Sequence, residues 1–343
     1  MFPFLSRLVT ILVVSMFVTA CSKKELRVFT WADYVKPELI QRFEQEHGCS
    51  VVIDTFDSNE AMYAKLQSGA SGYDIVVPSS YMADIMASQG MLQRLDLSRL
   101  PGTVNIDETI LAKIPDSKMQ FAVPYALSYG VLGYRKDKLA APAASWKMLE
   151  NESVLKKTSL LNDMRETLGA ALKYLGHSVN TTDEVQLEAA AEVVMKWKAN
   201  AVKFDNEQYK GAVDAGEFYL VHGYSGDLYQ VVSENSEVGI LVPQEGVVIA
   251  CDELAIPQSA AQADLAYKFI DFLLNPDVAA ENMEWMGYPC PNKAAVKKVS
   301  SEFLESPAIK VPREAMDRSE VIRDLGEDRV KYSRVWDKIK SGG

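Results

Sequence analysis

Short apolar runs alternate with amphipathic helical patterns along most of the chain. Residues 26–30 and 51–55 predict strands, and residues 37–46 between them have apolar side chains spaced to share one face of a helix. Residues 73–80 have the pattern of a fully buried strand that ends at Pro78 and opens into a polar loop. This alternation predicts an α/β protein with largely parallel sheets.

The second half of the chain continues the alternation. Two helices are predicted to begin at capping boxes, formed by Asp57 with Glu60 and by Thr181 with Glu184. No internal repeat and no Pro/Gly-rich linker interrupts the elements, so two domains would be joined by short crossing segments. Further strands are predicted at 131–134 and 249–257, and further helices at 145–149 on the surface, 163–174, 181–198, 264–274 and around 332–339.

The N-terminus has the pattern of an export signal. Arg7 is the only charge in the first twenty residues, and residues 8–18 form an apolar run that is too short to span a membrane. Small residues directly before Cys21 are typical of lipoprotein signals, in which the cysteine carries the lipid. We expect residues 1–20 to be removed and Cys21 to tether the mature protein to a membrane. A plain signal peptide with an incidental cysteine is the alternative.

Composition narrows the class of partner. About 320 residues follow position 20, more than one hydrophobic core usually serves, so two domains are expected. The formal net charge of −11 argues against nucleic acid and mildly favours a cationic ligand. Without a CxxC spacing or clustered histidines, no metal site is expected. Cys251 and Cys290 could form one disulfide, or both could be small buried apolar residues like Cys49, which is the default.

Polar and aromatic residues follow the strands predicted at 26–30 and 73–80. Open α/β sheets bind ligands at the carboxyl ends of their parallel strands, and these residues occupy such ends. One crevice is therefore expected to hold Trp31, Asp33, Tyr34, Ser79 and Tyr81.

Six segments, in the same order along the chain, resemble the spermidine- and putrescine-binding proteins of bacterial ABC transporters. They are 29–34 (FTWADY), 57–66 (DSNEAMYAKL), 74–81 (DIVVPSSY), 223–227 (GYSGD), 252–257 (DELAIP) and 287–292 (GYPCPN). The resemblance implies a two-lobed type II periplasmic-binding-protein fold, in which each lobe is a mostly parallel sheet flanked by helices and the ligand lies in the cleft. It also implies the boundaries, with a tether at 21–25, lobe one at 26–127 plus 252–296, and lobe two at 128–251 plus 297–343.

The function that the resemblance implies is capture of a polyamine outside the cytoplasm and delivery to the permease of an ABC transporter. It implies a monomer with no catalytic residue and no cofactor, held at the membrane only by the lipid on Cys21; putrescine and spermidine both stay open as ligands. A polyamine presents ammonium groups separated by methylenes, so its site needs carboxylates at fixed spacing and flat apolar walls. Aromatic rings suit these walls, since each cation–π contact contributes about 0.5–2 kcal/mol.

The resemblance assigns roles to individual acids and aromatic residues. Asp252 matches an ammonium-binding aspartate at the point where the chain crosses between lobes. Asp163 and Glu166 match acidic positions, although Asp-x-x-Glu at a helix start is also a capping pattern that would explain both. Asp33 and Asp227 resemble acids of the putrescine-selective branch, with turn or cap roles as the alternative. The remaining ligand-lining positions are Trp31, Tyr34, Ser79, Tyr81, Tyr224 and Tyr288.

Two positions depart from the resemblance and leave other functions open. Ala250 stands where an aromatic wall residue is usual, and Ile322 aligns loosely with a glutamine, so another organic cation or an amino acid is an alternative ligand. An anion is disfavoured because the candidates include at least five acids and no cluster of Arg or Lys. An enzyme is a further alternative, with His222 as the histidine nearest the crevice. A sensor lipoprotein without a transport role is another.

Overall fold

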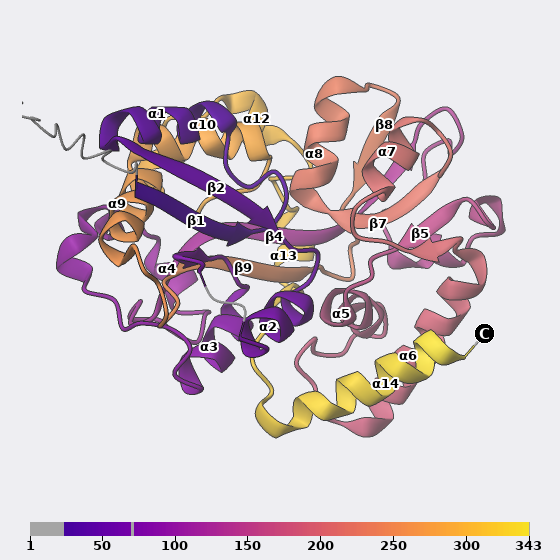
Figure 1. Cartoon of the computed structure of the whole chain (residues 1–343). Helices are drawn as coiled ribbons and strands as arrows, with labels where there is room; N and C mark the ends of the chain where they lie inside the picture. Colours follow the sequence, from indigo (N-terminus) through magenta and orange to yellow (C-terminus); the bar gives the residue numbers. More distant parts are fainter. Residues whose placement is uncertain (1–23, 70–71, 343) are drawn as a thin grey trace, which may run out of the picture.

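The computed structural model describes residues 24–69 and 72–342 and has two lobes that share a mixed β-sheet (Figure 1). Its hydrogen-bonded strands follow the order β2-β1-β3-β9-β4-β7-β5-β6, with β10 beside β9 and β8 beside β4. The predicted signal peptide at 1–20, Cys21 and most of the predicted tether at 21–25 lie outside the described residues.

The first lobe is built on parallel strands. β1 (Lys24–Thr30) pairs in parallel with β2 (Cys49–Thr55) and with β3 (Ile75–Val76). α1 (Pro37–His47) and α9 (Ala263–Leu274) place their apolar faces in one buried cluster with these strands. The remaining elements on this side are α2 (Asn59–Gln67), α3 (Ser80–Ser88), η1 (Leu97–Arg99), η2 (Pro101–Asn105), α4 (Glu108–Leu111), α10 (Pro276–Met286), α11 (Lys293–Val296) and α12 (Ser301–Glu305).

Two long strands cross from one lobe to the other. The first half of β4 (Ala122–Arg135) pairs antiparallel with β9 (Val248–Ala255), and its second half pairs antiparallel with β7 (Leu220–Tyr224) and β8 (Val238–Leu241). Figure 1 shows β4 passing through the middle of the molecule. The sequence predicted only residues 131–134 of β4 as a strand. The sheet is consequently more mixed than the largely parallel sheets predicted.

The second lobe repeats the parallel arrangement on a smaller scale. β5 (Thr158–Leu160) pairs in parallel with β7 and with β6 (Lys203–Phe204). The helices and short elements on this side are η3 (Trp146–Glu150), η4 (Glu152–Val154), α5 (Met164–Tyr174), α6 (Glu184–Asn200), α7 (Tyr209–Asp214), α8 (Ser225–Glu234), α13 (Arg313–Met316), β10 (Glu320–Val321), η5 (Gly326–Asp328) and α14 (Arg329–Ser341).

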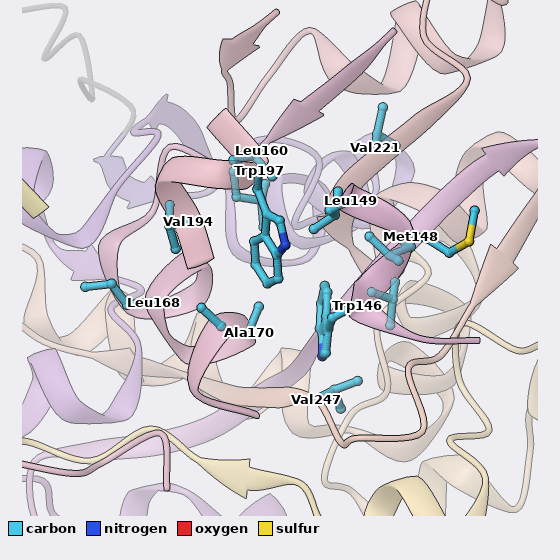
Figure 2. Packing of buried hydrophobic residues seen from close by; sticks show 14 of the residues in the cluster. Trp146, Met148, Leu149, Leu160, Leu168, Ala170, Val194, Trp197, Val221 and Val247 are labelled. Carbon is cyan, nitrogen blue, oxygen red and sulfur yellow. The ribbon is translucent and has the colours of Figure 1, made fainter. Parts of the chain in front are cut away.

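The core of the second lobe contains two fully buried tryptophans (Figure 2). The ring centroids of Trp146 and Trp197 lie 6.3 Å apart, with the rings inclined by 28°. Trp146 donates its indole N–H to the carbonyl of Gly246 over 3.0 Å, so its polar atom is satisfied inside the core. The prediction of a surface helix at 145–149 is therefore wrong, because this segment is a 3₁₀ turn that buries Trp146 together with Leu149.

Both predicted capping boxes are wrong. Ser58 caps α2 by accepting a hydrogen bond from the backbone N–H of Ala61 over 3.2 Å, and Asp57 lies one residue too early for this role. In the same way Asp183, rather than Thr181, caps α6. A capping side chain must reach the second or third N–H of the helix, and only the residue directly before the first turn does so.

The three cysteines of the described chain, Cys49, Cys251 and Cys290, are all buried. Cys251 and Cys290 are not joined by a disulfide, and burial raises the pKa of the Cys290 thiol to about 12. The default expectation of small buried side chains is thus the one that the structure supports.

Candidate functional site

A cavity lies between the two lobes, beside the crossing strand β9. It contains about 710 Å³ of empty space, counting the part open to solvent. The lining comes from the loop after β1, the starts of α3 and α5, the junction of β7 with α8, and β9. Ten of the eleven predicted ligand-binding residues line it: Trp31, Tyr34, Ser79, Tyr81, Asp163, Glu166, Tyr224, Asp227, Asp252 and Tyr288.

Asp252, on β9, is held in place by two hydroxyl groups. Tyr34 donates its hydroxyl to Oδ2 over 2.5 Å, and Ser79 donates to Oδ1 over 2.6 Å. The Ser79 hydroxyl in turn accepts a hydrogen bond from the amide of Asn59 over 3.0 Å. Burial raises the pKa of Asp252 to about 6, against the opposing effect of the two hydroxyls. The group is mainly a carboxylate at neutral pH, with its orientation fixed.

Asp163 and Glu166 enter the cavity from the N-terminus of α5. Oδ1 of Asp163 accepts hydrogen bonds from the backbone N–H of Arg165 (2.9 Å) and of Glu166 (3.0 Å), and Tyr224 donates its hydroxyl to Oδ2 over 3.1 Å. Glu166 is 2% exposed, and within the described chain neither of its carboxyl oxygens has a hydrogen-bond partner. Burial and the neighbouring Asp163 raise its pKa well above the usual range. Capping explains Asp163, but it does not explain Glu166.

A second set of acids lies nearer to solvent. Asp227 accepts hydrogen bonds from the hydroxyls of Tyr209 (2.6 Å) and Tyr288 (2.9 Å). The ammonium of Lys210 lies 3.7 Å from Oδ1 of Asp227 and 3.1 Å from Oδ2 of Asp33. Asp33 has a left-handed backbone with φ of 54° and a half-exposed side chain, and it reaches the edge of the cavity through Lys210. We call Asp163, Glu166 and Asp252 the inner acidic group, and Asp33 with Asp227 the outer acidic group.

Aromatic rings form the walls between these acids. The ring centroids of Tyr34 and Tyr288 lie 5.4 Å apart, and each of the two hydroxyls binds a different acidic group. Trp31 packs edge-on against Phe56 at 4.5 Å, and Tyr81, at the start of α3, is buried against the cavity. The arrangement offers flat apolar surface next to carboxylates, which suits an alkyl chain that carries cationic groups.

The profile of the bacterial extracellular solute-binding protein family matches residues 38–311 of this chain. The chain belongs to this family. It is 33% identical over 335 residues to the putrescine/cadaverine-binding protein of Pseudomonas aeruginosa, covering 94% of this chain and 95% of that protein. It is 34% identical over 325 residues to the spermidine/putrescine-binding periplasmic protein of Salmonella typhimurium, covering 94% and 93%.

The solved structure of the TpPotD lipoprotein of Treponema pallidum matches this solute-binding protein with a TM-score of 0.83 and 33% identity, covering 92% of this chain and 99% of that one. This match confirms the predicted two-lobed fold, and the two relatives confirm the resemblance on which that prediction was based.

Two basic side chains of the cavity were missed by the sequence analysis. Arg165 is buried, and its guanidinium donates to the carbonyl of Arg323 and to the side chain of Asn180, each over 3.0 Å. It falls inside the Asp-x-Arg-Glu segment that the sequence analysis used only for its acids, so this residue could have been found. Lys210 lies on a short helix without a recognisable motif, so no sequence pattern could have identified it. Among the described lining residues acids still outnumber bases by six to two.

The positions that depart from the family pattern face the same cavity. Ala250 and Ile322 both line it, and Ala250 lies across from Ser128 in the pairing of β4 with β9. His222 does not line the cavity; its ring packs edge-on against Trp146 at 5.1 Å, and burial lowers its pKa to about 3. A neutral histidine buried in this way has the role of a core side chain.

Proposed function

We propose that this protein binds a polyamine, putrescine or spermidine, outside the cytoplasm and delivers it to the permease of an ABC transporter. The observation that carries the proposal is Glu166, a buried carboxyl group that faces the cavity and has no hydrogen-bond partner in the described chain. Burying a carboxylate without a partner costs several kcal/mol, which a cation at the same place offsets. An ammonium group of the ligand is that cation.

The rest of the cavity supports a ligand with an alkyl chain. Asp252 lies beside Glu166 with its orientation fixed by two hydroxyls, and Tyr34 and Tyr288 lie against the space between the acidic groups. Methylenes on these rings and ammonium groups on these carboxylates use both features at once. The relatives named for putrescine, cadaverine and spermidine binding support the same ligand class.

The cellular setting follows from the family and from the N-terminal pattern. We infer export to the periplasm or the outer surface, removal of residues 1–20 and a lipid on Cys21 as the only membrane attachment. The protein acts as a monomer and catalyses no reaction. Within residues 24–69 and 72–342, no helix has the length and apolar character needed to span a membrane.

We infer that the polypeptide passes from one lobe to the other within β4 and again within β9, near the boundaries 127/128 and 251/252. In support, β4 changes partner from β9 to β7 and β8 along its length. The third boundary was expected at 296/297. We infer instead that the chain crosses after α12, since Phe303 of that helix is buried in one cluster with Met283 of α10 and is not part of the second core. Closing of the lobes around the ligand would then create the surface that the permease binds.

Calorimetric titration tests the proposal. The lipid-free mature domain, freed of carried-over ligand by partial unfolding and refolding, is titrated with putrescine and with spermidine. Saturable one-to-one binding in the micromolar range or tighter, about −8 kcal/mol or more favourable, is the expected result. No heat with either polyamine at millimolar concentration would refute the proposed function.

A second candidate ligand is a cation that also carries a carboxylate, such as an amino acid. Arg165 favours it, because this buried guanidinium lines the cavity and its Nε has no hydrogen-bond partner in the described residues. Titration with arginine and 4-aminobutyrate separates the candidates. Tighter binding of either than of both polyamines would support the second candidate.

A further inference from the structure

Lys210 lies beside Asp33 and Asp227, the carboxylates that could otherwise bind a second ammonium group of a ligand. Lys210 lines the cavity at the first turn of α7, and its side chain is 25% exposed. Its ammonium donates to Oδ2 of Asp33 over 3.1 Å and to the side chain of Gln230 over 3.3 Å, and it lies 3.7 Å from Asp227. The outer acidic group is therefore already neutralised in part by the protein itself.

The two acidic groups differ in this respect. Asp227 also accepts two tyrosine hydroxyls, so both of its oxygens are engaged, whereas both oxygens of Glu166 in the inner acidic group have no partner in the described residues. Burial disfavours the charge of Lys210, but Asp227 and Asp33 outweigh it and raise the pKa of the ammonium. The two acids thus favour the charged form of the lysine.

We propose that Lys210 determines ligand specificity by acting as a built-in cation that competes with the ligand for the outer acidic group. The proposal rests on the proposed function and makes it more specific. The ligand's decisive ammonium binds at the inner acidic group, and a second ammonium that reaches the outer group gains little, because Lys210 already holds those carboxylates. The ligand class is an amine that needs only one strongly paired cationic end.

The alternative is an ordinary surface ion pair between Lys210 and Asp33. Such pairs contribute about 0–1 kcal/mol to stability and would leave ligand binding unchanged. Lys210 lines the cavity between Asp33 of the loop after β1 and Asp227 of the first turn of α8, and this position is what distinguishes the proposal from this alternative.

The test compares putrescine with n-butylamine, which has the same number of carbons and one ammonium. Both are titrated into the wild-type protein, Lys210→Met, Lys210→Arg and Lys203→Met. Lys203, on β6, is the matched control, because it carries the same charge, pairs with Asp205 over 2.8 Å and does not line the cavity. The quantity compared is the ratio of the two affinities.

For Lys210→Met, putrescine is expected to bind about tenfold more tightly relative to n-butylamine than in the wild type, because its second ammonium gains free carboxylates. Lys210→Arg and Lys203→Met are expected to keep the wild-type ratio. If the affinity ratio of Lys210→Met equals that of the wild type, or if Lys210→Met binds both amines more weakly, the inference is overturned. The proposed function is still supported in that case as long as the wild-type protein binds polyamine. If Lys210→Met binds putrescine and the wild-type protein does not, the inference is supported and the proposed function is refuted. If neither the wild-type protein nor Lys210→Met binds putrescine, both are refuted.

Discussion

Replacing Glu166 with glutamine removes one charge from the cavity and little else. The side chain keeps its shape, and no hydrogen bond within the described residues is broken, since neither carboxyl oxygen has a partner. Burial and the neighbouring Asp163 raise the pKa of the group and so favour its neutral form in the unliganded protein, which the amide resembles. Stability without ligand should therefore change by less than about 1 kcal/mol.

Binding should respond much more strongly. With polyamine bound, the carboxylate becomes the partner of an ammonium, and loss of one partner of a buried charge pair costs about 2–5 kcal/mol. The expected result is a loss of affinity of at least about thirtyfold. Even the lower limit is far outside the error of a calorimetric titration.

Glu253→Gln, on β9, provides the matched control. Glu253 is 1% exposed, both of its oxygens are without a partner in the described chain, and burial raises its pKa well above the usual range, as for Glu166. It does not line the cavity. Each variant is titrated with putrescine and spermidine, and its melting temperature is recorded with and without ligand.

The reasoning predicts that Glu166→Gln loses the ligand-induced rise in melting temperature and that Glu253→Gln keeps it. Similar losses of affinity in the two variants would show that any buried carboxyl near β9 matters in the same general way. Wild-type affinity in Glu166→Gln would refute the assignment of Glu166 as the carboxylate that meets the ligand.

Three further predictions concern the other side chains of the cavity. Asp252→Asn should weaken polyamine binding more than Tyr34→Phe, because the first change leaves a buried cation unpaired; equal losses by titration would contradict this. Since the pKa of Asp252 is about 6, its protonation should lower polyamine affinity about tenfold from pH 7 to pH 5. The melting temperature of the unliganded protein should change in the opposite sense and fall as pH rises through 6, because folding favours the protonated form. Gly226→Ala places a methyl 2.3 Å from the ring of Tyr288, so it should reduce affinity for both polyamines, and unchanged titrations would argue against that wall.

Local sequence patterns were sufficient to predict a helix where residues that start or stop helices stand at its two ends. The helix predicted at 37–46 is α1 (Pro37–His47), and the helix predicted at 264–274 is α9 (Ala263–Leu274), because an apolar stripe and flanking Pro or Asn define both. β4 was underestimated for a physical reason. Pro124 suggests the end of a strand, but it lies at the register shift between Pro124 and Ala126, where a missing N–H costs no regular ladder bond.

The site was predicted largely through recognisable motifs, and its details depend on tertiary contacts. Lys210 meets Asp33 across 177 positions of sequence, and nothing in the short segment around the lysine indicates the contact. The sequence also left capping and ligand binding open for Asp163 and Glu166. The structure separates them, because Asp163 accepts the helix N–H groups while Glu166 accepts none.

The inner acidic group also suggests why closure would depend on ligand. Asp252 is carried by the crossing strand β9, whereas Asp163 and Glu166 are carried by α5 of the second lobe. In the structure these carboxyls are buried, and burial raises the pKa of each. Under the proposed function, an ammonium group relieves both the repulsion and the desolvation, so its affinity for the closed form exceeds that for the open form. That difference in affinity is what a permease needs in order to distinguish loaded protein from empty protein.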